Sequence, residues 1–172
     1  RNLLIKEFNK DTTRFDILQD IGKVSYYLHD YEGAHQYYER FLRILENQKL
    51  DVYQHEYLTI GNVFLKVGLK EKSEEFIAKY KVYLDKEKSI YKPLGIAMYS
   101  AYQHDTKKVI EYMNLFAKED NYQYWVILFC EDDPLLENIK DLPEIKFTGQ
   151  DMKDRFWKNH EKIKVTLEEK GL

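Results

Sequence analysis

The chain has 172 residues and a formal net charge of −3, with 44% apolar and 33% charged residues, which is typical of a globular protein rather than a disordered one. No apolar run reaches the ~18 residues that cross a bilayer, and the acidic balance argues against a nucleic-acid surface. The single cysteine, Cys130, excludes an intrachain disulfide and a cysteine-based zinc cluster.

The first third of the chain predicts one helical hairpin after a short leading helix. Residues 1–10 are expected to be the end of a helix from an earlier repeat. Apolar residues at helical spacing then form one stripe over 17–28 and a second over 37–45. The intervening segment 29–33 has the composition of a turn, so two antiparallel helices are expected.

The same unit returns twice. Stripes over 57–67 and 76–84 predict a second hairpin, and stripes over 96–100 and 109–116 predict a third. Asp105 or Thr106, at the break inside the third unit, can cap the following helix by accepting from free backbone N–H groups. Pro residues are absent before Pro93, which suits long helices.

Small or compact residues mark matching places in the three units. Each unit has a pair of them twelve positions apart, and we expect close helix–helix contact there: Gly22 and Ala34, Gly61 and Ser73, Ala97 and Val109. The spacing between units is 39 residues and then 36. A fixed period in this range is the signature of a repeat architecture.

This pattern resembles the tetratricopeptide repeat, whose basic unit has about 34 residues. The matching residues of the first unit are Leu18, Ile21, Gly22, Ala34, Tyr38 and Phe41. The resemblance implies an all-α solenoid of helical hairpins (an α-α superhelix) forming a single domain over 1–172. Its parts would be repeats at 12–50, 51–88 and 89–119, a variant unit at 120–147 and a capping helix at 151–170.

The C-terminal third departs from the repeat. The apolar run Tyr124–Cys130 could be a buried strand or a buried helix, and the repeat context favours a helix. Asp133 and Pro134 predict a helix start, whereas Pro143 is expected to begin a short piece that ends at Gly149. The inner side of the capping helix is expected to be lined by Met152, Phe156, Trp157, Ile163 and Leu167.

The segment Pro93–Phe147 also resembles the end of a group of bacterial signalling proteins, in which a repeat array follows a DNA-binding or nucleotide-cyclase domain. The residues that carry this resemblance are the apolar run from Trp125, then Asp133-Pro134, then Pro143 followed closely by Phe147. It implies a bacterial, cytoplasmic regulatory protein active in signal transduction or transcription. Because the sequence begins at Arg1, we expect it to be part of a longer protein.

The resemblance also implies where a partner would bind, since the first helix of each repeat lines the concave surface. The expected groove residues are Lys23, Tyr26, Tyr27, Asn62, Tyr91, Met98 and Tyr102. Tyrosine provides a large contact area with few rotatable bonds, which suits the recognition of a protein or peptide segment. The alternative is that neighbouring helices cover these tyrosines and make them part of the core.

No residue pattern points to catalysis, a cofactor or a metal. The five histidines include no i,i+4 pair, and His29 and His104 occupy equivalent turns in two repeats. Cys130 lies in an apolar run, where burial raises the pKa of a thiol. The sequence therefore predicts a non-enzymatic scaffold for protein–protein or intramolecular binding. Two alternatives remain: a homodimerising or purely structural module, and a sensor of a small ligand held in the groove.

Overall fold

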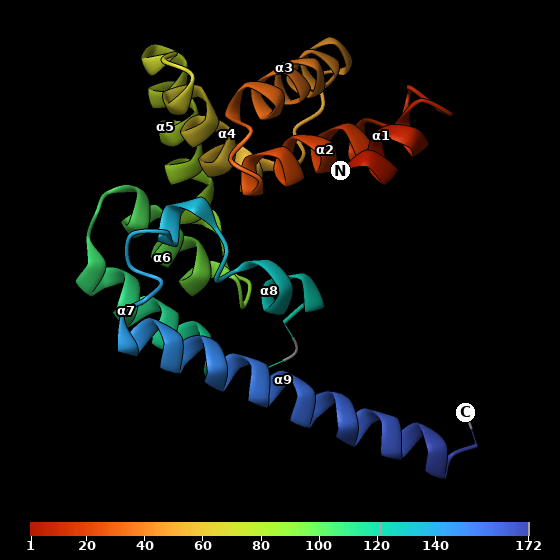
Figure 1. Cartoon of the computed structure of the whole chain (residues 1–172), viewed down its shortest axis with the longest axis vertical. Coiled ribbons are helices and arrows are strands. Elements are labelled where there is room, and N and C mark those ends of the chain that lie inside the picture. The colour runs from red at the N-terminus through yellow and green to blue at the C-terminus, as the bar shows by residue number, and fades with distance from the viewer. Residues whose placement is uncertain (121, 172) are drawn as a thin grey trace. The chain divides into compact units, whose positions relative to one another are not determined.

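The computed structural model describes residues 1–120 and 122–171. These residues form nine α-helices and two short 3-10 helices, with no strand among them, so the predicted all-α class is confirmed. The chain divides into two compact units, Arg1–Lys86 and Glu87–Leu172. The division falls close to the expected junction of the second and third repeats, and each unit is described by itself (Figure 1).

Unit 1 contains two helical hairpins in the predicted places. Its helices are α1 (Asn2–Phe8), α2 (Phe15–Tyr27), α3 (Tyr31–Gln48), α4 (Tyr57–Lys66) and α5 (Lys70–Lys86), with the 3-10 helix η1 (Gln54–Glu56) before α4. Helix α2 packs on α3, and α4 packs on α5. The largest side chains that these helices bury completely are Tyr26, Tyr38, Phe41, Phe64, Leu18, Ile21 and Ile60.

Gly22 and Gly61 lie where two helices of unit 1 approach one another closely, as expected. A Cβ atom on Gly22 would lie 3.2 Å from the ring of Tyr38 on α3. At Gly61 the corresponding distance to Ile77 Cδ1 on α5 is 2.8 Å. Larger side chains at these two positions would have to push the partner helix away, because protein interiors are already close-packed.

Two hairpin turns share one construction. His29 and His104 both adopt left-handed backbone angles, with φ of 57° and 61°. The aspartate that follows each histidine caps the next helix, since Asp30 accepts from the Gly33 N–H at 3.0 Å and Asp105 accepts from the Lys108 N–H at 3.1 Å. The equivalence of the two turns that the sequence predicted is therefore confirmed.

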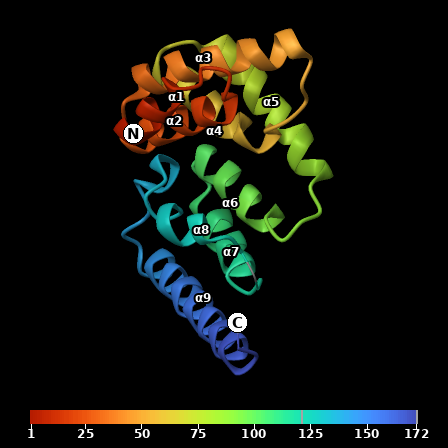
Figure 2. The same ribbon diagram turned by 90° about the vertical axis from the view of Figure 1, so that its right-hand side faces the viewer.

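Unit 2 contains the third hairpin and the C-terminal helices. Its elements are α6 (Lys92–Tyr102), α7 (Thr106–Phe116), α8 (Tyr124–Phe129), the 3-10 helix η2 (Pro134–Leu136) and α9 (Pro143–Glu169). Helix α6 packs on α7, and α9 packs on both α7 and α8 (Figure 2). The core centres on Ala97, Val109, Met113, Phe116, Leu136 and Ile145.

The apolar run at Tyr124–Cys130 forms helix α8, as the repeat context predicted. Asp133 caps the turn that follows, where its carboxylate accepts from the Leu135 N–H at 2.9 Å, and Pro134 is the first residue of η2. This helix start is confirmed, although it is a single 3-10 turn.

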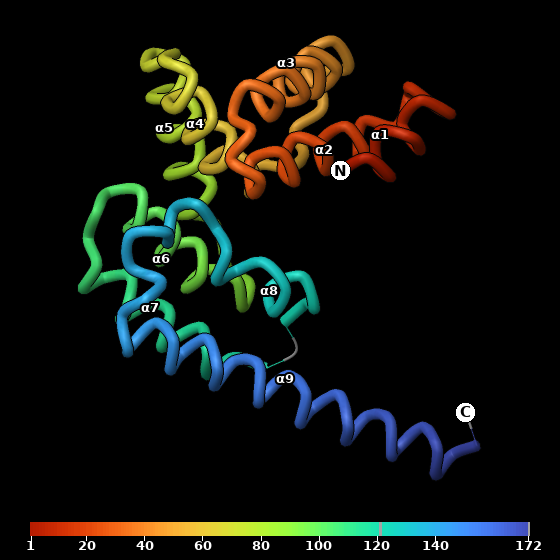
Figure 3. The backbone as a smooth tube through the Cα atoms, in the orientation of Figure 1, coloured from red at the N-terminus to blue at the C-terminus, as the bar shows by residue number. Residues whose placement is uncertain are grey.

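Two expectations for the C-terminus are wrong. Gly149 does not end a short helix, because α9 runs without interruption from Pro143 to Glu169 (Figure 3). Gly149 is buried inside α9, and a Cβ atom there would collide with the Glu131 carboxylate, so this glycine allows close approach. The expected inner side is also only partly buried: Met152 is 3% exposed, but Trp157, Ile163 and Leu167 are 49%, 56% and 43% exposed.

Candidate functional site

Two of the expected groove residues belong to the core of unit 1. Tyr26 is completely buried and Asn62 is 4% exposed, and the Asn62 amide donates to the Tyr26 hydroxyl oxygen at 3.0 Å. This bond joins α2 to α4. The alternative that helices cover these side chains therefore holds here, and neither residue can anchor a partner while unit 1 is folded.

Lys23 takes part in a buried ion pair that the sequence did not reveal. Its Nζ atom lies 2.6 Å from Oε1 of Glu56, a carboxylate whose side chain is only 2% exposed. The Tyr38 hydroxyl donates to the other oxygen of Glu56 at 3.2 Å, and His55 Nε2 lies 3.4 Å from Oε1. Three side chains from α2, α3 and η1 thus converge on one charge.

The electrostatics of this network favour an ionised Glu56. Burial by itself would raise the pKa of Glu56, but Lys23, His55 and the bond from Tyr38 together hold that pKa below its ordinary value. Burial and the adjacent negative charge raise the pKa of Tyr38, so its phenol stays protonated and can donate. The network therefore holds the two hairpins of unit 1 together through one buried, ionised carboxylate.

The remaining expected groove residues are half-buried. Tyr27 packs against Tyr26 with ring centroids 5.7 Å apart. In unit 2, the Tyr91 hydroxyl accepts from the Gln123 N–H at 2.9 Å, while Met98 lies against the core and Tyr102 is partly exposed. A single wall that includes residues of both units stays a prediction.

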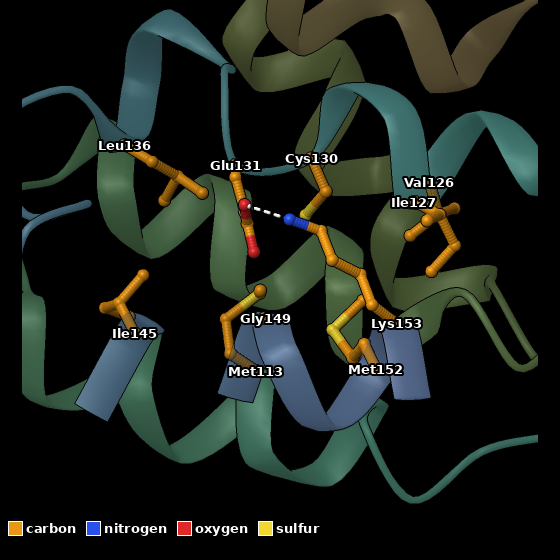
Figure 4. Close-up of a pocket in the computed structure, with 10 residues that line it drawn as sticks. All are labelled: Met113, Val126, Ile127, Cys130, Glu131, Leu136, Ile145, Gly149, Met152 and Lys153. Atoms are coloured by element: carbon orange, nitrogen blue, oxygen red, sulfur yellow. Dashed lines mark hydrogen bonds and ion pairs between the residues drawn. The ribbon is translucent and has the colours of Figure 1, made fainter. Parts of the chain in front are cut away.

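Unit 2 contains a small cavity between α7, α8 and α9 (Figure 4). Its volume is about 10 Å³, which is close to the space that one water molecule needs. An ion pair between Lys153 Nζ and Glu131 Oε2, 2.6 Å apart, lies beside it. Cys130 lines the cavity, and burial raises the pKa of its thiol to about 12. This cavity is too small for a ligand, and the thiol is a poor nucleophile.

The strongest candidate site is an exposed apolar surface on α8 and α9, which we call the α8–α9 surface. It consists of Tyr124, Leu128, Phe156, Trp157, His160, Ile163 and Leu167. The Tyr124 ring lies 5.6 Å from Phe156 and 5.8 Å from Trp157, and His160 lies 5.5 Å from Trp157. Helical spacing continues the surface from His160 to Ile163 and Leu167.

Neighbouring contacts hold this surface in place. The Tyr122 hydroxyl donates to the Met152 carbonyl at 2.6 Å, and its ring stacks on Phe156. Burial raises the pKa of Tyr122 to about 12, so this donor keeps its proton. The Asn159 amide donates to Asp120 at 3.2 Å. The first half of α9 is therefore fixed to its unit, and the aromatic side chains beyond it have a defined position.

Other kinds of site find no support in the part of the chain that the structure describes. That part contains no group of three or more His, Cys, Asp or Glu side chains that could hold a metal ion. None of its helices combines the length and the apolar character needed to cross a membrane. Comparison with protein-family models, with curated proteins and with solved structures found no match to this chain.

Proposed function

We propose that this chain is a non-catalytic interaction module that binds another protein chain through the α8–α9 surface. One observation carries the proposal: large apolar side chains gather on two adjoining helices although each is 43% to 56% exposed. These side chains are Tyr124, Leu128, Trp157, Ile163 and Leu167. Clusters of this kind on a soluble domain mark interaction sites, because their exposure to water is unfavourable.

The sequence resemblance supports a narrower form of this proposal. A terminal helical-repeat region in a bacterial signalling or transcription protein would act as its regulatory part, in the cytoplasm. Helical hairpins of the kind found in both units suit this role, since rigid packed pairs of helices can present a fixed surface to a partner. The domain upstream would then carry the activity that this module regulates.

Site-specific photo-crosslinking tests the proposal in cells that produce the full-length protein. A benzoylphenylalanine at Trp157 should give discrete adducts with a protein chain, because this position is 49% exposed within the proposed site. The same probe at Glu74, an exposed residue of α5, is the matched control and should give none. Adducts of equal pattern at both positions, or none at Trp157, would contradict the proposed function.

A further inference from the structure

Three sulfur-containing side chains of unit 2 surround the small cavity between α7, α8 and α9. Met113 of α7, Cys130 at the C-terminal end of α8 and Met152 of α9 all line this cavity. Figure 4 shows their sulfur-bearing ends gathered around the same space, although the three residues come from different helices. The chain has three methionines and one cysteine, so most of its sulfur atoms meet at this one place.

The Cys130 thiol faces this cavity without a polar partner. Its side chain is 6% exposed, and among residues 1–120 and 122–171 none forms a hydrogen bond with its sulfur atom. A buried thiol is either a small apolar group or a metal ligand whose proton can be replaced. The thioethers of Met113 and Met152 favour the second role, because they bring two more sulfur donors to the same space.

We propose that this cavity binds one soft monovalent metal ion, Cu(I), with Met113, Cys130 and Met152 as its three sulfur ligands. Thiolate and thioether ligands select Cu(I), whereas Mg²⁺ and Ca²⁺ need oxygen ligands and Zn²⁺ prefers thiolate, imidazole and carboxylate groups. The space of about 10 Å³ is too small for an organic molecule but suits a single ion. The site is separate from the proposed partner surface and does not depend on it.

The charge of the complex also favours a monovalent ion. Binding breaks the S–H bond of Cys130 and forms a copper–thiolate bond, and the proton leaves to the solvent. The Cu(I)–thiolate unit is neutral, and so are the two thioethers. A divalent ion would leave one uncompensated positive charge in an apolar cavity, because the nearby Glu131 carboxylate is already paired with Lys153 Nζ at 2.6 Å.

An ion can reach the cavity from solvent. Lys153 and Glu131 also line it, and their side chains are 34% and 39% exposed. The side of the cavity that these two residues form therefore lies next to water, whereas the three sulfur ligands are buried on its inner side. An ion that enters past the Lys153–Glu131 pair exchanges its hydration shell for the three sulfur donors.

Anaerobic titration of the 172-residue chain with Cu(I), in competition with a chromophoric Cu(I) chelator, tests the proposal. The parent should bind one ion per chain, and Cys130→Ser should bind none. Met113→Leu and Met152→Leu should each raise the dissociation constant by at least about 10-fold, since even groups that only support a metal ligand contribute about 10–100-fold to affinity. Leucine nearly conserves the volume of methionine, so both variants should keep the parent's circular dichroism.

Met98→Leu is the matched control. Met98 is the remaining methionine of the chain and packs against the core of the same unit, but it does not line the cavity. This variant should bind Cu(I) with the parent's affinity. An equal loss of affinity in all three leucine variants would contradict the ligand set, and so would no loss in any of them, because a lone thiol would then account for the binding.

The pH dependence gives a second readout. Burial raises the pKa of Cys130 to about 12, so the thiol must release its proton on binding, and the dissociation constant should fall about 10-fold for each unit of pH rise between about pH 6 and pH 8. An excess of Zn²⁺ should not displace Cu(I). A parent chain that binds no Cu(I) at micromolar concentration, a dissociation constant that does not change with pH, or displacement by Zn²⁺ would each overturn the proposal.

Discussion

The two units of the chain differ in the side chains that hold their helices together. Unit 1 buries polar side chains that pair with one another across its helices: Glu56 with Lys23 and Tyr38, and Asn62 with Tyr26. The core of unit 2 is mostly apolar and contains the sulfur atoms of Met113, Cys130 and Met152. Unit 2 instead leaves its aromatic residues half exposed on α8 and α9.

This difference affects how strictly the arrangement of the helices is fixed in each unit. The polar partners of unit 1 favour one arrangement of its hairpins, because a shift of α2 against α4 would leave Glu56 as an unpaired buried charge. Unit 2 has no buried ion pair of this kind among its described residues, although the buried Tyr122 hydroxyl donates to the Met152 carbonyl. Unit 2 also differs in the apolar surface that it exposes on α8 and α9.

Removal of the buried charge should give the largest effect. Glu56→Ala is expected to lower the free energy of unfolding by about 3 kcal/mol, the lower end for breaking a buried pair, because Lys23 keeps some contact with water. Urea denaturation followed by circular dichroism measures this. Glu161→Ala, which removes an exposed pair with Lys164, is the control and should cost less than about 0.5 kcal/mol. Equal effects in the two variants would refute the special role of Glu56.

A smaller effect is expected where α2 meets α3. Gly22→Leu should destabilise the chain by about 1–2 kcal/mol, since overpacking against the Tyr38 ring costs about 1–3 kcal/mol and the gain in helix propensity returns up to about 1 kcal/mol. Thermal or urea unfolding gives the value. Ala78→Leu, on an exposed position of α5, provides the comparison and should change stability by less than about 0.5 kcal/mol. A fully stable Gly22→Leu variant would mean that the two helices can separate at no cost.

The smallest expected effect is a change in the pH dependence of stability. The pKa of Glu56 is lower in the folded chain than its ordinary value of 4.5, so its contribution is present above that value and is lost as the pH falls through the folded pKa. Glu56→Gln cannot titrate at this position, and the stability difference between parent and variant should therefore shrink on acidification below about pH 4.5. Urea titrations at pH 7 and at pH 3.5 would show this, and a difference that grows on acidification would contradict it.

The hairpins could be predicted because their signals are local. Apolar stripes, the small residues Gly22 and Gly61, and the cap expected at Asp105 act within one helix or one turn. The Lys23–Glu56 pair had no such signal, since its partners are 33 positions apart and neither lies in a recognisable motif. Contacts of this kind depend on how one hairpin packs against the next, and a single sequence does not show that packing.

Two of the expected groove residues, Tyr26 and Asn62, lie in the core for a related reason. A tyrosine suits both a groove and a core, because its ring is apolar and its hydroxyl needs only one partner, which Asn62 supplies to Tyr26. On α9, an apolar stripe looks the same whether it covers its own unit or faces outward. Ile163 and Leu167 were therefore expected to be buried, and only the length of the continuous helix from Pro143 shows that they lie beyond the core.

The buried thiol of unit 2 can report how often the core of that unit opens. Cys130 is 6% exposed and its pKa of about 12 keeps it almost entirely protonated at neutral pH, so a thiol reagent reacts only after the surrounding helices separate. Cys130 is the single cysteine of the chain, so every labelling event reports the opening of the helices around it. The labelling rate therefore measures how often this core opens under native conditions.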